Sequence, residues 1–154
     1  MLNGLALFFD KKRKGNTMKY QFDCGDRHKY FKCYCQLKKY GVGDCTMRAI
    51  TIATGIDYKV VWDSLADISK ETGSLPNSRE VCEAFLSRNG WERQSPIRKR
   101  GGKKRFKLGK TPIDDDQRYI FHCSNHWTAV VNGVNRDTWD NRNMCSNSYW
   151  IKVK

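Results

Sequence analysis

The Asn132-Gly133 pair constrains the fold of this chain most strongly, because it stands between two valine-containing runs. Asn-Gly flanked by β-branched residues is typical of a two-residue turn in which both central residues have positive φ. Such a turn pairs Val131 with Val134 and makes the surrounding residues an antiparallel hairpin. From about Tyr119 onward, the remaining apolar runs also indicate strands.

The register of this hairpin brings polar side chains to one of its faces. Continued from the turn, it places Thr128 opposite Asp137 and His126 opposite Trp139. Side chains two residues apart in a strand share a face, so we expect His126 and Asp137 to be diagonal neighbours. A carboxylate in that position can hydrogen-bond one imidazole nitrogen and leave the other for a second partner. The alternative is an ordinary half-buried hairpin with polar residues on its solvated face.

The region before these strands predicts three helices. Each has a polar N-cap residue and a glycine near its C-terminus: residues 45–54 between Asp44 and Gly55, a second helix between Asp57 and Gly73, and a third between Ser78 and Gly90. Apolar residues recur at helical spacing in the second and third helices, which predicts that these faces are buried. Helices followed by antiparallel strands predict an α+β domain with the helices packed on the sheet.

Cys45 opens the first of these helices. A sulfur atom there faces unpaired backbone N–H groups and the positive end of the helix dipole, which favour thiolate over thiol. The same N–H groups could stabilise the oxyanion of an acyl intermediate. Together with His126 and Asp137, Cys45 supplies the groups that a thiol nucleophile needs. A buried structural cysteine under a helix start is the alternative.

Three motifs resemble those of papain-like cysteine peptidases, of the compact kind found among small phage and bacterial proteins and the bacteriocin-processing peptidases. They are Cys45 at a helix start, Asn125-His126 leading a strand, and Asp137-Thr138-Trp139, which is similar to the Asn-Ser-Trp that follows the catalytic histidine in papain relatives. The resemblance covers roughly residues 36–153. It implies a papain-like fold, in which residues 149–153 form the closing strand of a half-barrel, and a catalytic triad of Cys45, His126 and Asp137.

The chain departs from the papain pattern in several places. The Cys-Gly before the nucleophile and the Trp soon after it are absent, and Cys45 is much closer to His126 than the ~130 residues of papain and cathepsins. The third triad member is Asp rather than Asn. The family completes its oxyanion hole with an upstream glutamine, for which Gln36 is the nearby candidate beside the Cys45 N–H, although it lies a little too far from Cys45.

The resemblance implies a cysteine hydrolase without a cofactor. We expect a peptidase or isopeptidase that forms a thioester acyl-enzyme on a protein or peptide substrate. The alternative is a noncatalytic, phage-type effector that keeps the fold and binds nucleic acid or a host protein through a basic surface.

The formal charge of +13 is large for 154 residues, and eight basic residues lie between Arg98 and Lys110. Such a run predicts an exposed, mobile connection that could attract nucleic acid or an acidic protein. Its candidate partner-binding residues are Arg98, Lys99, Arg100, Lys103, Lys104, Arg105 and Lys107. Only Phe106 within it offers an aromatic ring for base stacking, and a solvated loop without a specific partner is the alternative.

The length predicts one domain over residues 18–154, preceded by a basic extension, residues 1–17, that can be disordered. Residues 2–9 are apolar but lack the preceding basic segment of a secretion signal. We therefore expect the seven cysteines to be free thiols in a reducing cytoplasm, the host cytoplasm if the protein is phage-encoded. No apolar run approaches the roughly 20 residues of a transmembrane helix, so we expect no membrane association.

Four potential metal ligands lie close together in the sequence: Cys24, His28, Cys33 and Cys35. They could form a tetrahedral zinc site, but one residue separates the last two cysteines where zinc knuckles have two to four. Core cysteines in a β-like segment are therefore the favoured interpretation. His122 and His126 are also unsuited to one metal, because four residues of strand span roughly 13 Å.

Overall fold

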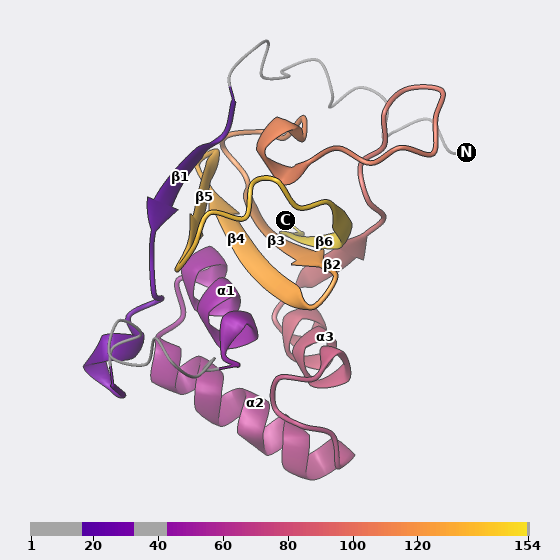
Figure 1. Cartoon of the computed structure of the whole chain (residues 1–154). Helices are drawn as coiled ribbons and strands as arrows, with labels where there is room; N and C mark the ends of the chain where they lie inside the picture. Colours follow the sequence, from indigo (N-terminus) through magenta and orange to yellow (C-terminus); the bar gives the residue numbers. More distant parts are fainter. Residues whose placement is uncertain (1–16, 33–42, 154) are drawn as a thin grey trace.

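The computed structural model describes residues 17–32 and 43–153, in which three helices and a six-stranded mixed sheet form an α+β fold (Figure 1). The helices are α1 (Cys45–Thr54), α2 (Tyr58–Thr72) and α3 (Arg79–Arg88). The strands are β1 (Lys19–Phe22), β2 (Trp91–Gln94), β3 (Arg118–Cys123), β4 (His126–Val131), β5 (Val134–Asp137) and β6 (Ser146–Lys152). Short 3-10 helices span Arg27–Lys29 and Leu108–Lys110. Across the described ranges, each helix falls short of the length and apolar character that a membrane-crossing segment requires.

The three helices begin and end where the sequence predicts. The Asp57 carboxylate accepts hydrogen bonds from the N–H groups of Lys59 and Val60 at the start of α2, and the Ser78 hydroxyl accepts one from Val81 in α3. Left-handed glycines follow α1 and α2: Gly55 (φ 76°) and Gly73 (φ 72°). Asp44 stands at the N-cap position of α1, but its side chain makes no capping bond, so that part of the prediction is wrong.

The hairpin formed by β4 and β5 has the predicted register. Val131 pairs with Val134, and the pairing continues through Val130–Asn135 to Ala129–Arg136. Asn132 and Gly133 adopt φ values of 50° and 70°, as the two-residue turn requires. The next positions in this register are Thr128 and Asp137. The predicted strands and their register are therefore confirmed.

Two short edge strands were not predicted. The sheet has the order β1-β5-β4-β3-β6-β2, with β1 parallel to β5 and β2 antiparallel to β6. The sheet is therefore mixed: the C-terminal strands pair antiparallel as expected, and the parallel strand β1 comes from the N-terminal region. The stretch around Cys24 also differs from the β-like segment expected there, because Arg27–Lys29 is a 3-10 helix.

The two faces of the sheet contact different cores. Ile120, Trp127 and Trp150 pack with buried residues of α1, α2 and α3, which all lie on one side of the strands in Figure 1. The residues that alternate with them face a smaller core that includes Tyr119, Phe121, Val130, Met18, Leu108 and Ile113. The second core draws its residues from segments far apart in the chain.

The basic segment divides into an exposed and a buried part. Residues 98–107, hereafter the basic hairpin, fold back through an Arg98–Arg105 bridge and a Lys104 carbonyl that accepts from Lys99 N–H at 2.9 Å. The segment then enters the second core, where Leu108 is fully buried and its N–H donates to the Met144 carbonyl at 2.7 Å. The prediction that residues 98–110 form a solvent-exposed connection is therefore wrong for the C-terminal end of this segment.

Candidate active site

Cys45 and His126 meet where the N-terminus of α1 approaches the first residue of β4. The His126 imidazole and the backbone N–H of Trp127 both act on the Cys45 sulfur and lower the pKa of its thiol. The packing of α1 against β4 fixes this approach, because Met47 and Ala49 belong to the same core as Trp127. The sulfur is thus held by a side chain and a backbone group from the same strand.

Asp137 orients the imidazole from the adjacent strand. His126 Nε2 lies 2.7 Å from Asp137 Oδ2, which leaves Nδ1 as the ring nitrogen for the Cys45 sulfur. The second carboxylate oxygen, Oδ1, accepts the backbone N–H of Thr138 at 2.7 Å. Asp137 is 2% exposed, so the carboxylate is buried and its position is fixed by these donors.

The electrostatics of the site favour an ion pair between sulfur and imidazole. Burial alone would lower the pKa of His126, but the hydrogen bonds and charges of Asp137 and Cys45 raise it to about 9. Burial would raise the pKa of Cys45, yet His126, the Trp127 N–H and the positive charge of Arg48 together lower it. Burial likewise opposes ionisation of Asp137, and its contacts with His126 outweigh that effect and lower its pKa. The thiolate and the imidazolium therefore stabilise each other.

Asn141 is a member of the site that the sequence did not reveal. It is fully buried, and its Nδ2 donates to Asp137 Oδ2 at 2.7 Å and to Thr128 Oγ1 at 3.1 Å. Asn135 Nδ2 also donates to Thr128 Oγ1, at 2.9 Å. This face of the hairpin, which the alternative interpretation left solvated, is a buried polar network around the Asp137 carboxylate.

A buried ionic cluster surrounds Asp44, the residue directly before Cys45. The Asp44 carboxylate pairs with Arg48 through Oδ1, and its Oδ2 accepts from Arg27 at 3.0 Å and from the Tyr58 hydroxyl at 2.7 Å. Asp44 is 1% exposed, so these contacts explain why its side chain does not cap α1. Arg48 Nη2 also reaches Asp137 Oδ1, at 3.4 Å.

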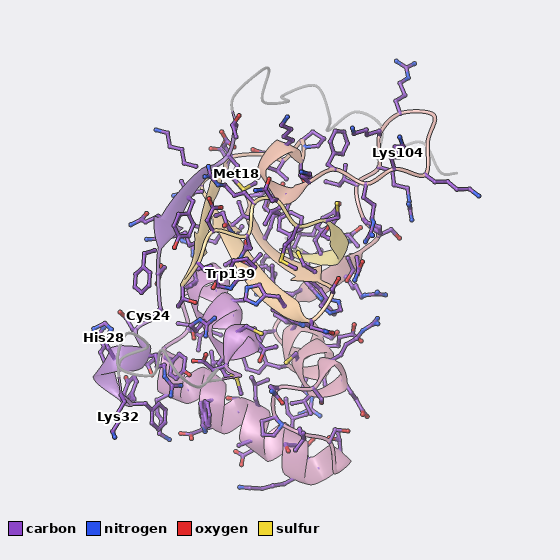
Figure 2. All side chains as sticks on the ribbon, in the orientation of Figure 1. Met18, Cys24, His28, Lys32, Lys104 and Trp139 are labelled. Atoms are coloured by element: carbon purple, nitrogen blue, oxygen red, sulfur yellow. The ribbon has the colours of Figure 1, made fainter. Side chains whose placement is uncertain are left out.

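Trp139 covers one side of the imidazole. Its ring centroid lies 5.0 Å from that of His126, with the planes inclined by 50°. The indole is 43% exposed, and Trp139 is labelled in Figure 2. The third residue of the Asp137-Thr138-Trp139 motif therefore separates the catalytic histidine candidate from solvent.

The other candidate residues do not join this site. His122 packs on Trp127, with ring centroids 5.3 Å apart, and burial lowers its pKa. Cys24 Sγ lies 3.3 Å from His28 Nδ1, but the described residues contain no group of three or more His, Cys, Asp or Glu able to hold a metal. The remaining zinc candidates, the oxyanion candidate and most of the N-terminal extension lie outside the described residues: Cys33, Cys35, Gln36 and residues 1–16.

Comparison of the chain with protein-family models, with curated proteins and with solved structures finds no match in any of the three.

Proposed function

We propose that the protein is a papain-like cysteine hydrolase, a peptidase or isopeptidase that acts through Cys45, His126 and Asp137. The observation that carries this proposal is the placement of the three groups: the His126 imidazole acts on the Cys45 sulfur and lowers the pKa of its thiol, and its Nε2 lies 2.7 Å from the buried Asp137 carboxylate. A nucleophile, a base and a group that orients the base are the components of covalent acyl transfer.

The geometry suggests how each residue acts. The Cys45 thiolate attacks the substrate carbonyl and forms a C–S bond, while backbone N–H groups at the start of α1 stabilise the oxyanion. His126 gives its proton to the leaving amine as the C–N bond breaks, which leaves a thioester. His126 then takes a proton from water, whose oxygen attacks the thioester, and the thiolate departs. Asp137 holds the imidazole in one orientation and stabilises its protonated form.

The arrangement of elements supports the papain-like form of this proposal. A helix begins at the cysteine, a strand begins at the histidine, and the carboxylate ends the neighbouring strand. Tyr149 and Trp150 lie in β6, which pairs with β3. We assign β6 as the closing strand of the papain-like form. A reducing cytoplasm suits such a nucleophile, and the cysteines in the described residues are free.

Selective alkylation of Cys45 tests the proposal without a known substrate. Limiting iodoacetamide at pH 6, followed by mass spectrometry of each cysteine, should label Cys45 at least tenfold faster than Cys24, which is also partly exposed. Cys82 is a buried reference whose pKa is raised to about 12 by burial, so it should stay unlabelled. His126→Ala should remove the selectivity. Equal labelling of Cys45 and Cys24 in the folded wild-type protein would contradict the proposal.

The basic hairpin supports a second function, binding of nucleic acid or an acidic protein. Arg98 and Arg105 donate to the carbonyl oxygens of Lys103 and Ser146, and these neutral acceptors leave the positive charge uncompensated. Lys99 Nζ lies 5.8 Å from the centre of the Phe106 ring, so this ring is already covered by a cation. The hairpin therefore favours contacts with phosphate or carboxylate groups over base stacking.

A further inference from the structure

Arg48 is the residue that connects the two halves of the candidate site. It lies in α1, three residues after Cys45, and is 4% exposed. Its guanidinium contacts Asp44, which directly precedes the nucleophile, and Asp137, which is 89 residues further along the chain and orients the base. One planar group with several N–H donors can bridge two carboxylates in this way, whereas an ammonium group offers a single point of charge.

The buried charges around Arg48 balance only when it is present. With the thiolate and imidazolium formed, three positive groups oppose three negative ones: Arg27, Arg48 and His126 against Asp44, Cys45 and Asp137. Removing the guanidinium leaves an excess of negative charge in a region shielded from water, where charges interact strongly. That excess disfavours the thiolate.

We propose that Arg48 is a positioning residue that ties the start of α1 to the end of β5 and stabilises the Cys45 thiolate beside His126. The proposal rests on the function proposed above, because it assumes that the Cys45 sulfur is the nucleophile. The contribution of Arg48 has two parts. Its positive charge favours the thiolate, and the N–H groups of its planar guanidinium fix Asp137 relative to Asp44.

The other groups that face these carboxylates do not replace Arg48. Asp44 also contacts Arg27 and Tyr58, but neither of those reaches Asp137 in the contacts of the described residues. The buried thiol of Cys82, near Cys45, is neutral because burial raises its pKa to about 12. The titratable groups near Asp137 include His126, the buried thiol of Cys123, and Tyr20 and Asp140, which lie closer to the surface. Its carboxylate also accepts from the amide of Asn141 and the N–H of Thr138, which are neutral. Only Arg48 spans both carboxylates in these contacts.

The test is the pH dependence of Cys45 alkylation by iodoacetamide in wild type and variants. The acidic limb of the rate-against-pH profile is the range in which the Cys45 thiol loses its proton. In Arg48→Met, this limb should move up by about one pH unit or more, so that labelling at pH 6 slows about tenfold or more. Arg48→Lys should keep most of the limb because it keeps the charge. Arg88→Met is the matched control, since it removes one arginine from an exposed pair with Glu71 and should leave the limb unchanged.

The downfield NMR resonance of the His126 Nε2 proton reports the positioning part directly. It should broaden in both Arg48 variants, because neither methionine nor lysine has a planar guanidinium group that can fix Asp137. Circular dichroism establishes which variants are folded. Should Arg48→Met unfold, Arg48→Lys decides the question: an unbroadened Nε2 signal in that variant would overturn the proposal. An unchanged acidic limb in folded Arg48→Met would overturn it as well.

The two proposals fail in different ways. If wild-type Cys45 has the acidic limb of an ordinary thiol, near pH 8.5, the proposed hydrolase function fails. If wild type has the lowered limb and folded Arg48→Met keeps it, only the role of Arg48 fails.

Discussion

A partly buried thiol gains nucleophilic character only where other groups offset its loss of hydration, and at Cys45 those groups come from two elements. His126 and the Trp127 N–H belong to β4, while Arg48 belongs to α1 itself. A thiolate stabilised from both sides depends on the relative placement of helix and strand. The chemistry of this residue is therefore coupled to the packing of α1 on β4.

Substitutions in the triad should differ in severity once a substrate is identified. Cys45→Ala and His126→Ala should each abolish turnover, because nucleophile and base act as one unit. Asp137→Ala should be milder, since the carboxylate orients and supports the imidazole without making or breaking bonds. Steady-state kinetics on folded variants provides the measurement, and turnover that survives Cys45→Ala would show that the roles are misassigned.

Asp137→Asn should shift the basic limb of Cys45 reactivity downward. Asp137 raises the pKa of His126, so the imidazolium is held until about pH 9 and is lost above it. Without that negative charge, the histidine should lose its proton closer to its ordinary value of about 6.5. The measurement is the alkylation rate between pH 6 and 10, with Asp140→Asn as an exposed control. A basic limb that stays near pH 9 in Asp137→Asn would show that another group holds the proton.

The sequence predicts the triad but not the residues that surround it. Cys45 follows from a helix start, and His126 and Asp137 follow from the register set by Asn132-Gly133, all of which are local signals. Asn141 and Arg48 act through contacts with Asp137 that depend on how loops and helices pack. A mid-helix arginine is ordinarily a solvent-exposed side chain, so its burial could not be inferred from its position.

At the scale of elements, local signals fix the helices and the central hairpin but miss the sheet edges. The polar caps and glycines define α2 and α3, and the Asn-Gly turn defines β4 and β5. By contrast, β1 and β2 are four residues long and largely exposed, so their side chains show no clear alternation. Such strands form because an existing sheet offers unpaired N–H and C=O groups, which is a property of the folded partner.

The tip of the basic hairpin lies outside the core, so its charges can be changed without removing core contacts. Replacing four tip cations by Gln should weaken binding to a single-stranded oligonucleotide and reduce its salt dependence, with the slope of log K against log salt falling by up to about 3. These residues are Lys99, Arg100, Lys103 and Lys104. The rate of Cys45 alkylation should be nearly unchanged, since these residues lie outside the contacts of the site.

A charge-matched control separates local from general electrostatics. Four exposed or partly exposed lysines elsewhere can be replaced by Gln: Lys19, Lys29, Lys59 and Lys70. The control variant has the same net charge as the hairpin variant, so equal losses of affinity would mean that overall charge, and not the basic hairpin, attracts the polyanion. Binding to an acidic peptide in place of the oligonucleotide would assign the hairpin to a protein partner.

At the scale of the whole molecule, two cores on opposite faces of one sheet hold the site in place. The helical core fixes α1 and with it Cys45, while the second core fixes the segment that leads from Asn141 to β6. That segment is joined to Leu108 and Gly109 through carbonyls of Met144 and Arg142. The position of Asn141 beside Asp137 thus depends on residues that follow the basic hairpin, far from the triad in the sequence.

Truncation of Leu108 tests this dependence. Leu108 is fully buried in the second core, so Leu108→Ala should lower the free energy of unfolding by about 2–5 kcal/mol. Leu75→Ala is the matched control, because Leu75 is 73% exposed and its loss should change stability by less than about 0.5 kcal/mol. Denaturant titration measures both. If the second core also positions Asn141, folded Leu108→Ala should show a weakened Asn141–Asp137 contact and slower alkylation of Cys45 at pH 6. Unchanged alkylation in a destabilised variant would mean that the helical core alone fixes the nucleophile.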